Sequence, residues 1–251
     1  MAVRLRRTAL CLLLALASCK PVSAPAHDFS TERERMVQEQ IATRGVTDAR
    51  VLAAMRKVPR DAFVPEAVRD LSYTDQPLPI GYDQTISQPY IVALMTEKLR
   101  VKPTDRILEI GTGSGYQAAI LGELAAEVYT IEIIEPLGKR AAATLQRLGY
   151  KNAHVKIGDG YQGWPEHAPF DAVIVTCAPD HVPQPLIDQT KEGGRIIIPV
   201  GSTGIQNLYL FEKKDGRLEQ RMILPVRFVP MTGKATQSKP DEAQPAGAPH
   251  P

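Results

Sequence analysis

The stretch RILEIGTGSGYQAAIL, residues 106–121, decides the fold class of this chain. It begins with an apolar run typical of a buried strand, continues through Gly111, Gly113 and Gly115, and ends in a helical pattern. A glycine-rich turn between a strand and a helix lets a ligand approach the backbone and directs the helix N-terminus at it. The stretch therefore predicts an α/β fold with a ligand site at this turn.

Strands and helices alternate around and beyond this stretch. Apolar runs predict strands over residues 106–110, 128–134, 153–157, 171–177 and 195–200, and helices over 117–126, 137–148 and near 185–190. Strands that are apolar throughout and joined by amphipathic helices favour a mostly parallel, doubly wound sheet covered on both faces. Two late strands, near 208–212 and 222–229, are separated by KKDGR and predict an antiparallel C-terminal hairpin at one edge.

Helices are also predicted before the first of these strands. Thr31 and Glu34 have the spacing of a capping box for one helix, and Thr47 is placed to cap a second. A third helix begins near Pro89, a residue that suits a first helical turn. Ser87 or Gln88 then stands at the cap position, and spacing alone favours a capping role for Ser87.

The two ends of the chain differ from its centre. Residues 1–28 combine a cationic start, a short apolar run and LASC before Cys19, which is typical of a secretory signal with a lipobox. The alternative is a start placed too early, with Met36 as a later one. Residues 234–251 are rich in Pro and Ala and predict a disordered tail. One globular domain is therefore expected over residues 29–233.

The composition disfavours some classes of function and site. The net charge of +2 in 251 residues, much of it at the extreme N-terminus, gives no basic face for nucleic acid. Cys177 is the one cysteine outside the signal-like segment, so the domain has no disulfide, and its apolar run predicts a core residue rather than a nucleophile. The histidines show no ligand spacing, so no metal is expected.

Acidic and aromatic residues near the glycines discriminate between ligands. Tyr116 stands where a dinucleotide fingerprint requires Gly or Ala, which disfavours a nicotinamide or flavin. Glu109 would repel a pyrophosphate but suits the cationic methionine end of S-adenosylmethionine. Glu132, at the end of the second strand, is placed to accept hydrogen bonds from ribose hydroxyls, which nucleotides and S-adenosylmethionine share.

A third element, GDG at residues 158–160, follows the third strand. Asp159 could accept a hydrogen bond from an adenine amine, and Gly160 would leave room for the ring. A plain turn explains Asp159 and Gly160 equally well when they are considered alone. Together with the glycine turn and Glu132, they favour one nucleoside-shaped pocket.

The combined pattern closely resembles the protein-L-isoaspartate O-methyltransferase family of class I S-adenosylmethionine-dependent enzymes. The resemblance extends over nearly the whole region between the signal-like segment and the tail. The segments that carry it are VPRDAFVPE (58–66), LPIGYDQTISQPY (78–90), RILEIGTGSGYQAAIL (106–121), GDGYQGW (158–164), FDAVIVTCAP (170–179), EGGRIIIPVG (192–201) and VRFVPMTG (226–233).

The resemblance implies a Rossmann-like methyltransferase fold and a methyl transfer from S-adenosylmethionine to the free α-carboxylate of L-isoaspartyl residues in damaged proteins. It implies Ser87 as the active-site residue, with Thr85 beside it and Thr232 near the cleft. The cofactor residues that it implies are Gly111, Gly113, Gly115, Glu132, Asp159 and Gly160.

Two alternatives remain open from the sequence: a nicotinamide-dependent oxidoreductase, and a non-catalytic lipoprotein that has kept the fold. S-adenosylmethionine is a cytosolic metabolite, so we expect a cytoplasmic enzyme. We also expect a monomer that acts on isoaspartyl-containing proteins. A lipidated Cys19 would instead place the chain at a membrane facing the periplasm.

Overall fold

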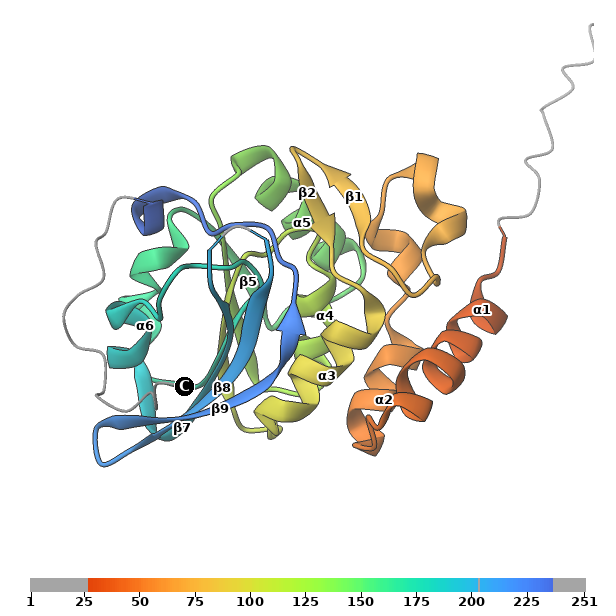
Figure 1. Ribbon diagram of the computed structural model, residues 1–251. Helices are drawn as coiled ribbons and strands as arrows, with labels where there is room; N and C mark the ends of the chain where they lie inside the picture. Colours follow the sequence, from red (N-terminus) through yellow and green to blue (C-terminus); the bar gives the residue numbers. More distant parts are fainter. Residues whose placement is uncertain (1–26, 203, 237–251) are drawn as a thin grey trace, which may run out of the picture.

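The computed structural model describes residues 27–202 and 204–236. The predicted signal, the lipobox at Cys19 and most of the predicted tail lie outside the described residues. Within those residues a single sheet is flanked by helices, and a small hairpin projects beside it (Figure 1).

The sheet has seven strands in the order β5-β4-β3-β6-β7-β8-β9. The first five strands in this order are parallel, and β8 and β9 are antiparallel additions at one edge. The mostly parallel sheet and the C-terminal hairpin are therefore confirmed. The strands are β3 (Arg106–Ile110), β4 (Glu127–Glu132), β5 (Ala153–Ile157), β6 (Phe170–Val175), β7 (Thr190–Val200), β8 (Gln206–Lys214) and β9 (Arg217–Val226).

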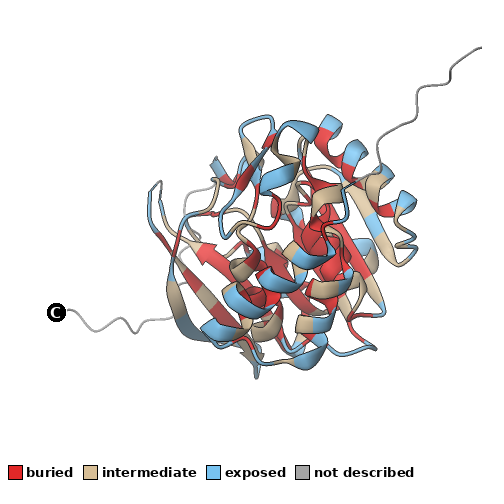
Figure 2. Ribbon diagram, turned by 90° about the vertical axis from the view of Figure 1, so that its right-hand side faces the viewer, coloured by how far each residue is buried: buried red, intermediate tan, exposed pale blue. Residues whose placement is uncertain are grey.

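Helices pack on both faces of this sheet because side chains alternate along each strand. Ile107 of β3 joins the core cluster that contains α3, α4 and α5, whereas its neighbour Leu108 joins the cluster with α6. Figure 2 shows the buried strands between helices whose outer faces are exposed. The α-helices are α1 (Ser30–Arg35), α2 (Ala49–Lys57), α3 (Pro89–Leu99), α4 (Tyr116–Gly122), α5 (Glu135–Arg147) and α6 (Gln184–Asp188).

Short helical turns complete the described chain. A π-helical segment η1 (Met36–Ile41) continues α1, and the 3-10 turns are η2 (Ala42–Arg44), η3 (Arg60–Phe63), η4 (Glu66–Leu71), η5 (Gly160–Gln162), η6 (Pro165–His167) and η7 (Gly233–Thr236).

The predicted caps of the first two helices are wrong. Helix α1 begins at Ser30, so Thr31 lies inside it, and the Asp28 carboxylate accepts from the Ser30 amide at 2.9 Å. Helix α2 is capped by Asp48, whose carboxylate accepts from the Arg50 amide at 2.8 Å. In both cases a nearby Asp provides the stronger, charged acceptor.

The hairpin beside the sheet was not predicted. Its strands are β1 (Leu78–Gly81) and β2 (Gln84–Ile86), which pair antiparallel around a turn with φ of 55° at both Tyr82 and Asp83. Two left-handed residues are the geometry of a hairpin turn that normally uses Asn or Gly, so the sequence gives little warning of it. The Arg140 guanidinium of α5 donates to the Ile80 carbonyl and ties the hairpin to the domain.

Candidate active site

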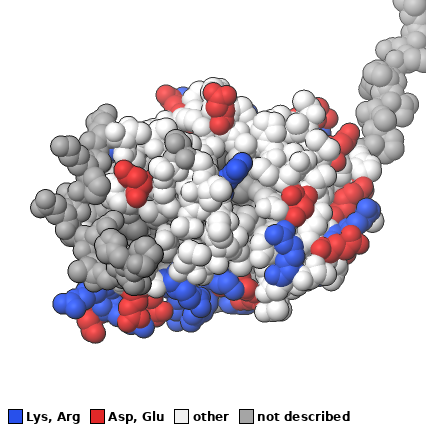
Figure 3. Space-filling model, viewed as in Figure 1, with Lys and Arg blue, Asp and Glu red and all other residues white. Residues whose placement is uncertain are grey.

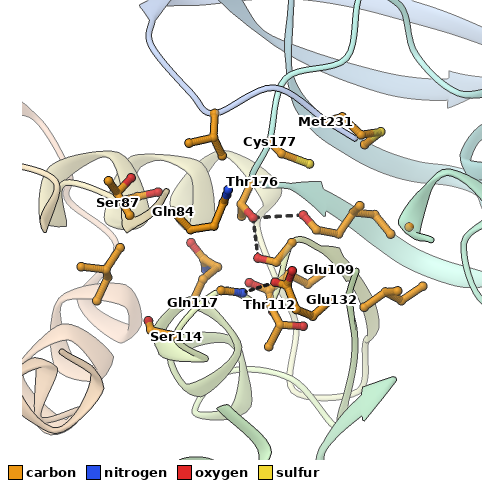
Figure 4. A pocket seen from close by; sticks show the side chains of 18 of the residues that line it. Gln84, Ser87, Glu109, Thr112, Ser114, Gln117, Glu132, Thr176, Cys177 and Met231 are labelled. Atoms are coloured by element: carbon orange, nitrogen blue, oxygen red, sulfur yellow. Dashed lines mark hydrogen bonds between the residues drawn. The ribbon is translucent and has the colours of Figure 1, made fainter. Parts of the chain in front are cut away.

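A pocket of about 990 Å³, including its open mouth, lies at the carboxyl ends of β3, β4 and β6 (Figure 4). This edge, where the strand order reverses between β3 and β6, is the usual ligand site of an open α/β sheet. The hairpin β1–β2 and the segment after β9 form its other walls. Predicted site residues that line it are Thr85, Ser87, Gly111, Gly113, Glu132, Gly160 and Thr232.

Two predicted cofactor residues do not line this pocket. Gly115 has φ of 90°, and a Cβ on it would lie 3.4 Å from Ala141 and Leu145 of α5, so this glycine permits close packing of α4 on α5. The Asp159 carboxylate accepts from the amides of Tyr161 at 2.9 Å and Lys234 at 2.8 Å. Asp159 therefore fastens the C-terminal segment beside the pocket.

The glycine turn is shaped by a threonine that sequence reasoning missed. The Thr176 hydroxyl, just after β6, lies 2.6 Å from the carbonyl oxygen of Gly111 and 3.0 Å from that of Ile110. Gly111 has φ of 96°, and a Cβ there would lie 2.5 Å from the Thr176 oxygen. Gly160 is equally constrained, because a Cβ on it would clash with the Ile110 side chain. Both glycines are thus required by the close packing of the pocket floor.

We expect Gly111→Ala to lower the free energy of unfolding by about 2–4 kcal/mol, because it adds a steric clash to an unfavourable left-handed backbone. Gly45→Ala is the matched control: its φ is 91°, but nothing lies within 4 Å of the added Cβ. Urea unfolding of both variants measures the difference. Equal losses in the two variants would mean that the contact with Thr176 is relieved without cost.

Glu132 holds the loop through both of its carboxylate oxygens. One accepts from the Gly113 amide at 2.8 Å and the other from the Ile134 amide at 3.0 Å. A carboxylate has about four acceptor positions, so each oxygen keeps one for a ligand hydroxyl. The Glu132 side chain is buried at the pocket wall, where a residue that binds the hydroxyls of a ribose would lie.

Glu109 is a buried carboxyl group at the pocket. Its side chain is fully buried and lines the pocket, and neither carboxylate oxygen has a well-formed hydrogen bond to a described residue, since the nearby Thr130 hydroxyl pairs with Thr112. Burial raises the pKa of Glu109 to about 8. A buried carboxylate without a partner is costly, so this position favours a cationic group of a ligand.

Ser87 is not the cap of α3. Gln88 is the N-cap residue and makes no side-chain capping bond, and Pro89 occupies the first turn as predicted. The Ser87 hydroxyl is half-buried and makes no hydrogen bond to a described residue. Figure 4 shows Ser87 on the side of the pocket away from Glu109 and Glu132. It is therefore free to bind a ligand.

Gln117 and Cys177 also line the pocket and were not identified as site residues. The Gln117 amide donates to the Thr96 hydroxyl at 3.0 Å, which fixes its orientation at the pocket wall. Cys177, predicted as a core residue, also lines the pocket. Burial raises the pKa of the Cys177 thiol to about 12, so it remains protonated and is no nucleophile at neutral pH.

A second hollow, the outer groove, adjoins the pocket between the end of β9 and the start of α3. It encloses about 1190 Å³, including open space, and shares Thr85, Ser87, Thr176 and Val229 with the pocket. The remaining groove residues are Arg44, Pro77, Gln88, Ile91, Ile205, Leu224, Pro225, Val226, Arg227 and Phe228. Ser87 and Thr85 thus stand at the boundary between two cavities.

Comparison with known proteins identifies the family. The model of the protein-L-isoaspartate(D-aspartate) O-methyltransferase family matches residues 31–236. The chain belongs to this family. The protein-L-isoaspartate O-methyltransferase of Opitutus terrae is 54% identical over 231 residues, which cover 92% of this chain and 98% of that protein. The one of Gloeobacter violaceus is 56% identical over 203 residues, covering 80% and 99%.

Solved structures that resemble this chain carry the name of the same isoaspartyl methyltransferase family. One named protein-L-isoaspartate O-methyltransferase is 33% identical with a TM-score of 0.76, covering 81% of this chain and 67% of that one. A Plasmodium falciparum chain, described as a beta-aspartate methyltransferase in complex with S-adenosyl-L-homocysteine, is 26% identical with a TM-score of 0.70, covering 80% and 98%. The predicted fold and the S-adenosylmethionine-dependent isoaspartyl methyltransferase activity are confirmed.

Two predictions for this isoaspartyl methyltransferase concern membranes and metals. Within residues 27–202 and 204–236, no helix is both long and apolar enough to cross a membrane. The same residues contain no group of three or more His, Cys, Asp or Glu side chains placed to hold a metal ion. The expectation that the enzyme needs no metal stays a prediction.

Proposed function

We propose that the pocket binds S-adenosylmethionine and that Ser87 orients the α-carboxylate of an isoaspartyl residue that enters from the outer groove. One observation carries this proposal: Ser87, with a hydroxyl that has no partner among the described residues, lines both the pocket and the groove. A group that must touch the cofactor and the protein substrate at once belongs at such a boundary.

The pocket supplies a suitable group for each part of the cofactor. Glu109 would pair with the ammonium group of the methionine portion, Glu132 would accept from the ribose hydroxyls, and the backbone of Gly111, Gly113 and Gly160 would line the ligand. The bound S-adenosyl-L-homocysteine of the Plasmodium falciparum structure supports this ligand. Gly115 and Asp159 would act indirectly, by positioning the walls. Thr232 lines the pocket on the C-terminal segment, where it would contact the ligand.

The reaction requires alignment rather than a base. The substrate carboxylate is already ionised near neutral pH, and the cofactor supplies a methyl group on a positively charged sulfur. A carboxylate oxygen attacks that methyl carbon as the bond from carbon to sulfur breaks, giving a methyl ester and the neutral thioether. The Ser87 hydroxyl would donate to one carboxylate oxygen and leave the other to attack. The backbone amide nitrogen of the next residue then attacks the ester carbonyl and expels methanol without help, which gives a succinimide, and hydrolysis of that ring returns some normal aspartate.

Transfer of labelled methyl groups to a pair of peptides tests this function. One peptide contains L-isoaspartate and the other contains aspartate at the same position. We expect labelling of the first alone, with the label lost in base as methanol. Equal labelling of both peptides, or of neither while S-adenosylhomocysteine still binds, would contradict the assignment of substrate.

We also propose that the enzyme works in the cytoplasm, because it consumes S-adenosylmethionine, which cells make there. We further propose that it is a monomer. Mass analysis of the N-terminus of the native protein, combined with cell fractionation, tests the location. An acylated Cys19 would overturn it. Sedimentation of the purified chain tests the monomer.

A further inference from the structure

The outer groove has an unbalanced charge. Its lining residues, taken from the part of the chain that the structure describes, include Arg44 and Arg227 but no Asp, Glu or Lys. The pocket next to it is lined by Glu109 and Glu132 and by no described Lys or Arg. Figure 3 shows that the centre of the face seen in Figure 1 has few charged side chains compared with its lower edge. An acidic group that enters the groove therefore meets arginines and no carboxylate among the described lining residues.

The two arginines of the groove differ in how they are held. Arg44 forms an ion pair with Asp75 at 2.8 Å, and its guanidinium lies 3.6 Å from the centre of the Tyr90 ring. Both the charge and the flat face of Arg44 are thus already in use. Arg227 is exposed and forms no hydrogen bond, ion pair or ring contact with any described residue.

The backbone that carries Arg227 is fixed on its C-terminal side. The Phe228 amide donates to the Gln206 side chain at 2.9 Å, and the Val229 carbonyl accepts from the Ala178 amide at 2.8 Å. Arg227 is therefore a side chain with no partner among the described residues, on a fixed segment of backbone. It lies two residues before Val229, which lines both the pocket and the outer groove, as Ser87 does. A cation placed in this way is available to a substrate without rearrangement of the main chain.

We propose that Arg227 makes the enzyme favour isoaspartyl sites that have an acidic residue immediately before or after the isoaspartyl residue. This inference rests on the proposed function, since it assigns the outer groove to the protein substrate. The apolar side chains of Ile205, Leu224 and Phe228 line the same groove and would contact the methylenes of a flanking glutamate while Arg227 pairs with its carboxylate.

The flanking residue, rather than the reacting carboxylate, is the partner that the arrangement favours. Arg227 lines the outer groove and not the pocket, whereas Ser87 lines both. A guanidinium bound directly to the attacking carboxylate would also lower its nucleophilicity. The neutral Ser87 hydroxyl would orient the reacting carboxylate, and the Arg227 cation in the groove would select substrates by the residue that flanks it.

Competition between peptides measures this preference. Peptides with the same isoaspartyl site and either Glu or Gln on its N-terminal or C-terminal side are mixed in pairs, and the methylated products are counted by mass spectrometry. We expect the native chain to favour Glu by about two- to fivefold in kcat/KM on at least one side, as for an exposed ion pair. The preference should shrink at about 0.5 M salt.

Arg227→Gln should reduce the preference to about one while the Gln peptides react as before. Arg221→Gln is the control, because it removes the same charge from β9 at a residue outside the groove. No preference in the native chain, or an equal loss of preference in Arg221→Gln, would overturn the inference. An equal fall in rate for all peptides in Arg227→Gln would assign Arg227 to the reacting carboxylate instead. Failure to methylate any peptide would count against the proposed function itself.

Discussion

Replacing Ser87 by alanine is expected to lower the rate of isoaspartyl methylation by about 10- to 1000-fold while S-adenosylhomocysteine binds as before. The hydroxyl lines the boundary between the pocket and the outer groove and has no partner among the described residues. Its removal would leave the substrate carboxylate free to rotate, so fewer encounters would bring an oxygen in line with the methyl group. The loss should appear mainly in kcat.

Stability separates this role from a structural one. Because Ser87 makes no capping bond, Ser87→Ala should change the free energy of unfolding by less than about 0.5 kcal/mol. The neighbouring Thr85 is exposed and lines the same two cavities, so Thr85→Val is the matched comparison and should lose less activity. Single-turnover methylation, calorimetric binding and urea unfolding give the three readouts. Unchanged turnover in Ser87→Ala would remove Ser87 from the mechanism.

The sheet was predictable because two signals mark its strands, their own composition and the glycines that come directly after them. The runs at 106–110 and 153–157 combine apolar with polar residues and are followed directly by glycines, and the observed β3 and β5 have the predicted bounds. Glycines and acids at the ends of successive parallel strands must converge at one edge. This rule is why Gly111, Gly113, Glu132 and Gly160 line one pocket.

Features that depend on tertiary contacts were not predictable in this way. Gly115 and Asp159 match the family's cofactor pattern, yet Gly115 permits the packing of α4 on α5 and Asp159 accepts from backbone amides. The importance of Thr176 comes from its closeness to Gly111, which is 65 residues away in the chain. The sequence could not predict that Arg227 lacks a partner among the described residues, because ion pairs such as that of Arg44 with Asp75 form only in the folded chain.

Replacing Glu109 by glutamine is expected to weaken S-adenosylhomocysteine binding by about 30- to 1000-fold, because it removes the buried charge proposed to pair with the ligand ammonium. The same variant should change how binding depends on pH. Burial raises the pKa of Glu109 to about 8, so the carboxyl of the unliganded protein is mostly protonated at neutral pH. Pairing with a cation requires the ionised form, so binding should release a proton below pH about 8. Affinity of the native protein should rise with pH up to that value and then level off.

The free energy of unfolding of the unliganded protein should fall as pH rises, whereas the affinity for the ligand rises. The folded pKa of Glu109 lies above the value of 4.5 expected of the unfolded chain. Between these two values the folded state holds a proton that the unfolded state has lost, so stability falls as pH rises through this window. Above pH about 8 the native protein contains a buried, unpaired charge that Glu109→Gln lacks. The variant should therefore gain stability relative to the native chain as pH increases, although it binds the ligand less tightly.

Calorimetry in two buffers of different ionisation enthalpy counts the released proton, and urea unfolding at pH about 6 and about 9 tests the change in stability. Glu127→Gln is the matched control, because Glu127 begins the adjacent strand β4 and lies outside the pocket. It should keep both the affinity and the proton release of the native chain. Proton release that persists in Glu109→Gln would assign the titration to another group. Tight binding by that variant at every pH would instead show that the ligand ammonium is held elsewhere, and that the buried carboxyl of Glu109 stays neutral while the ligand is bound.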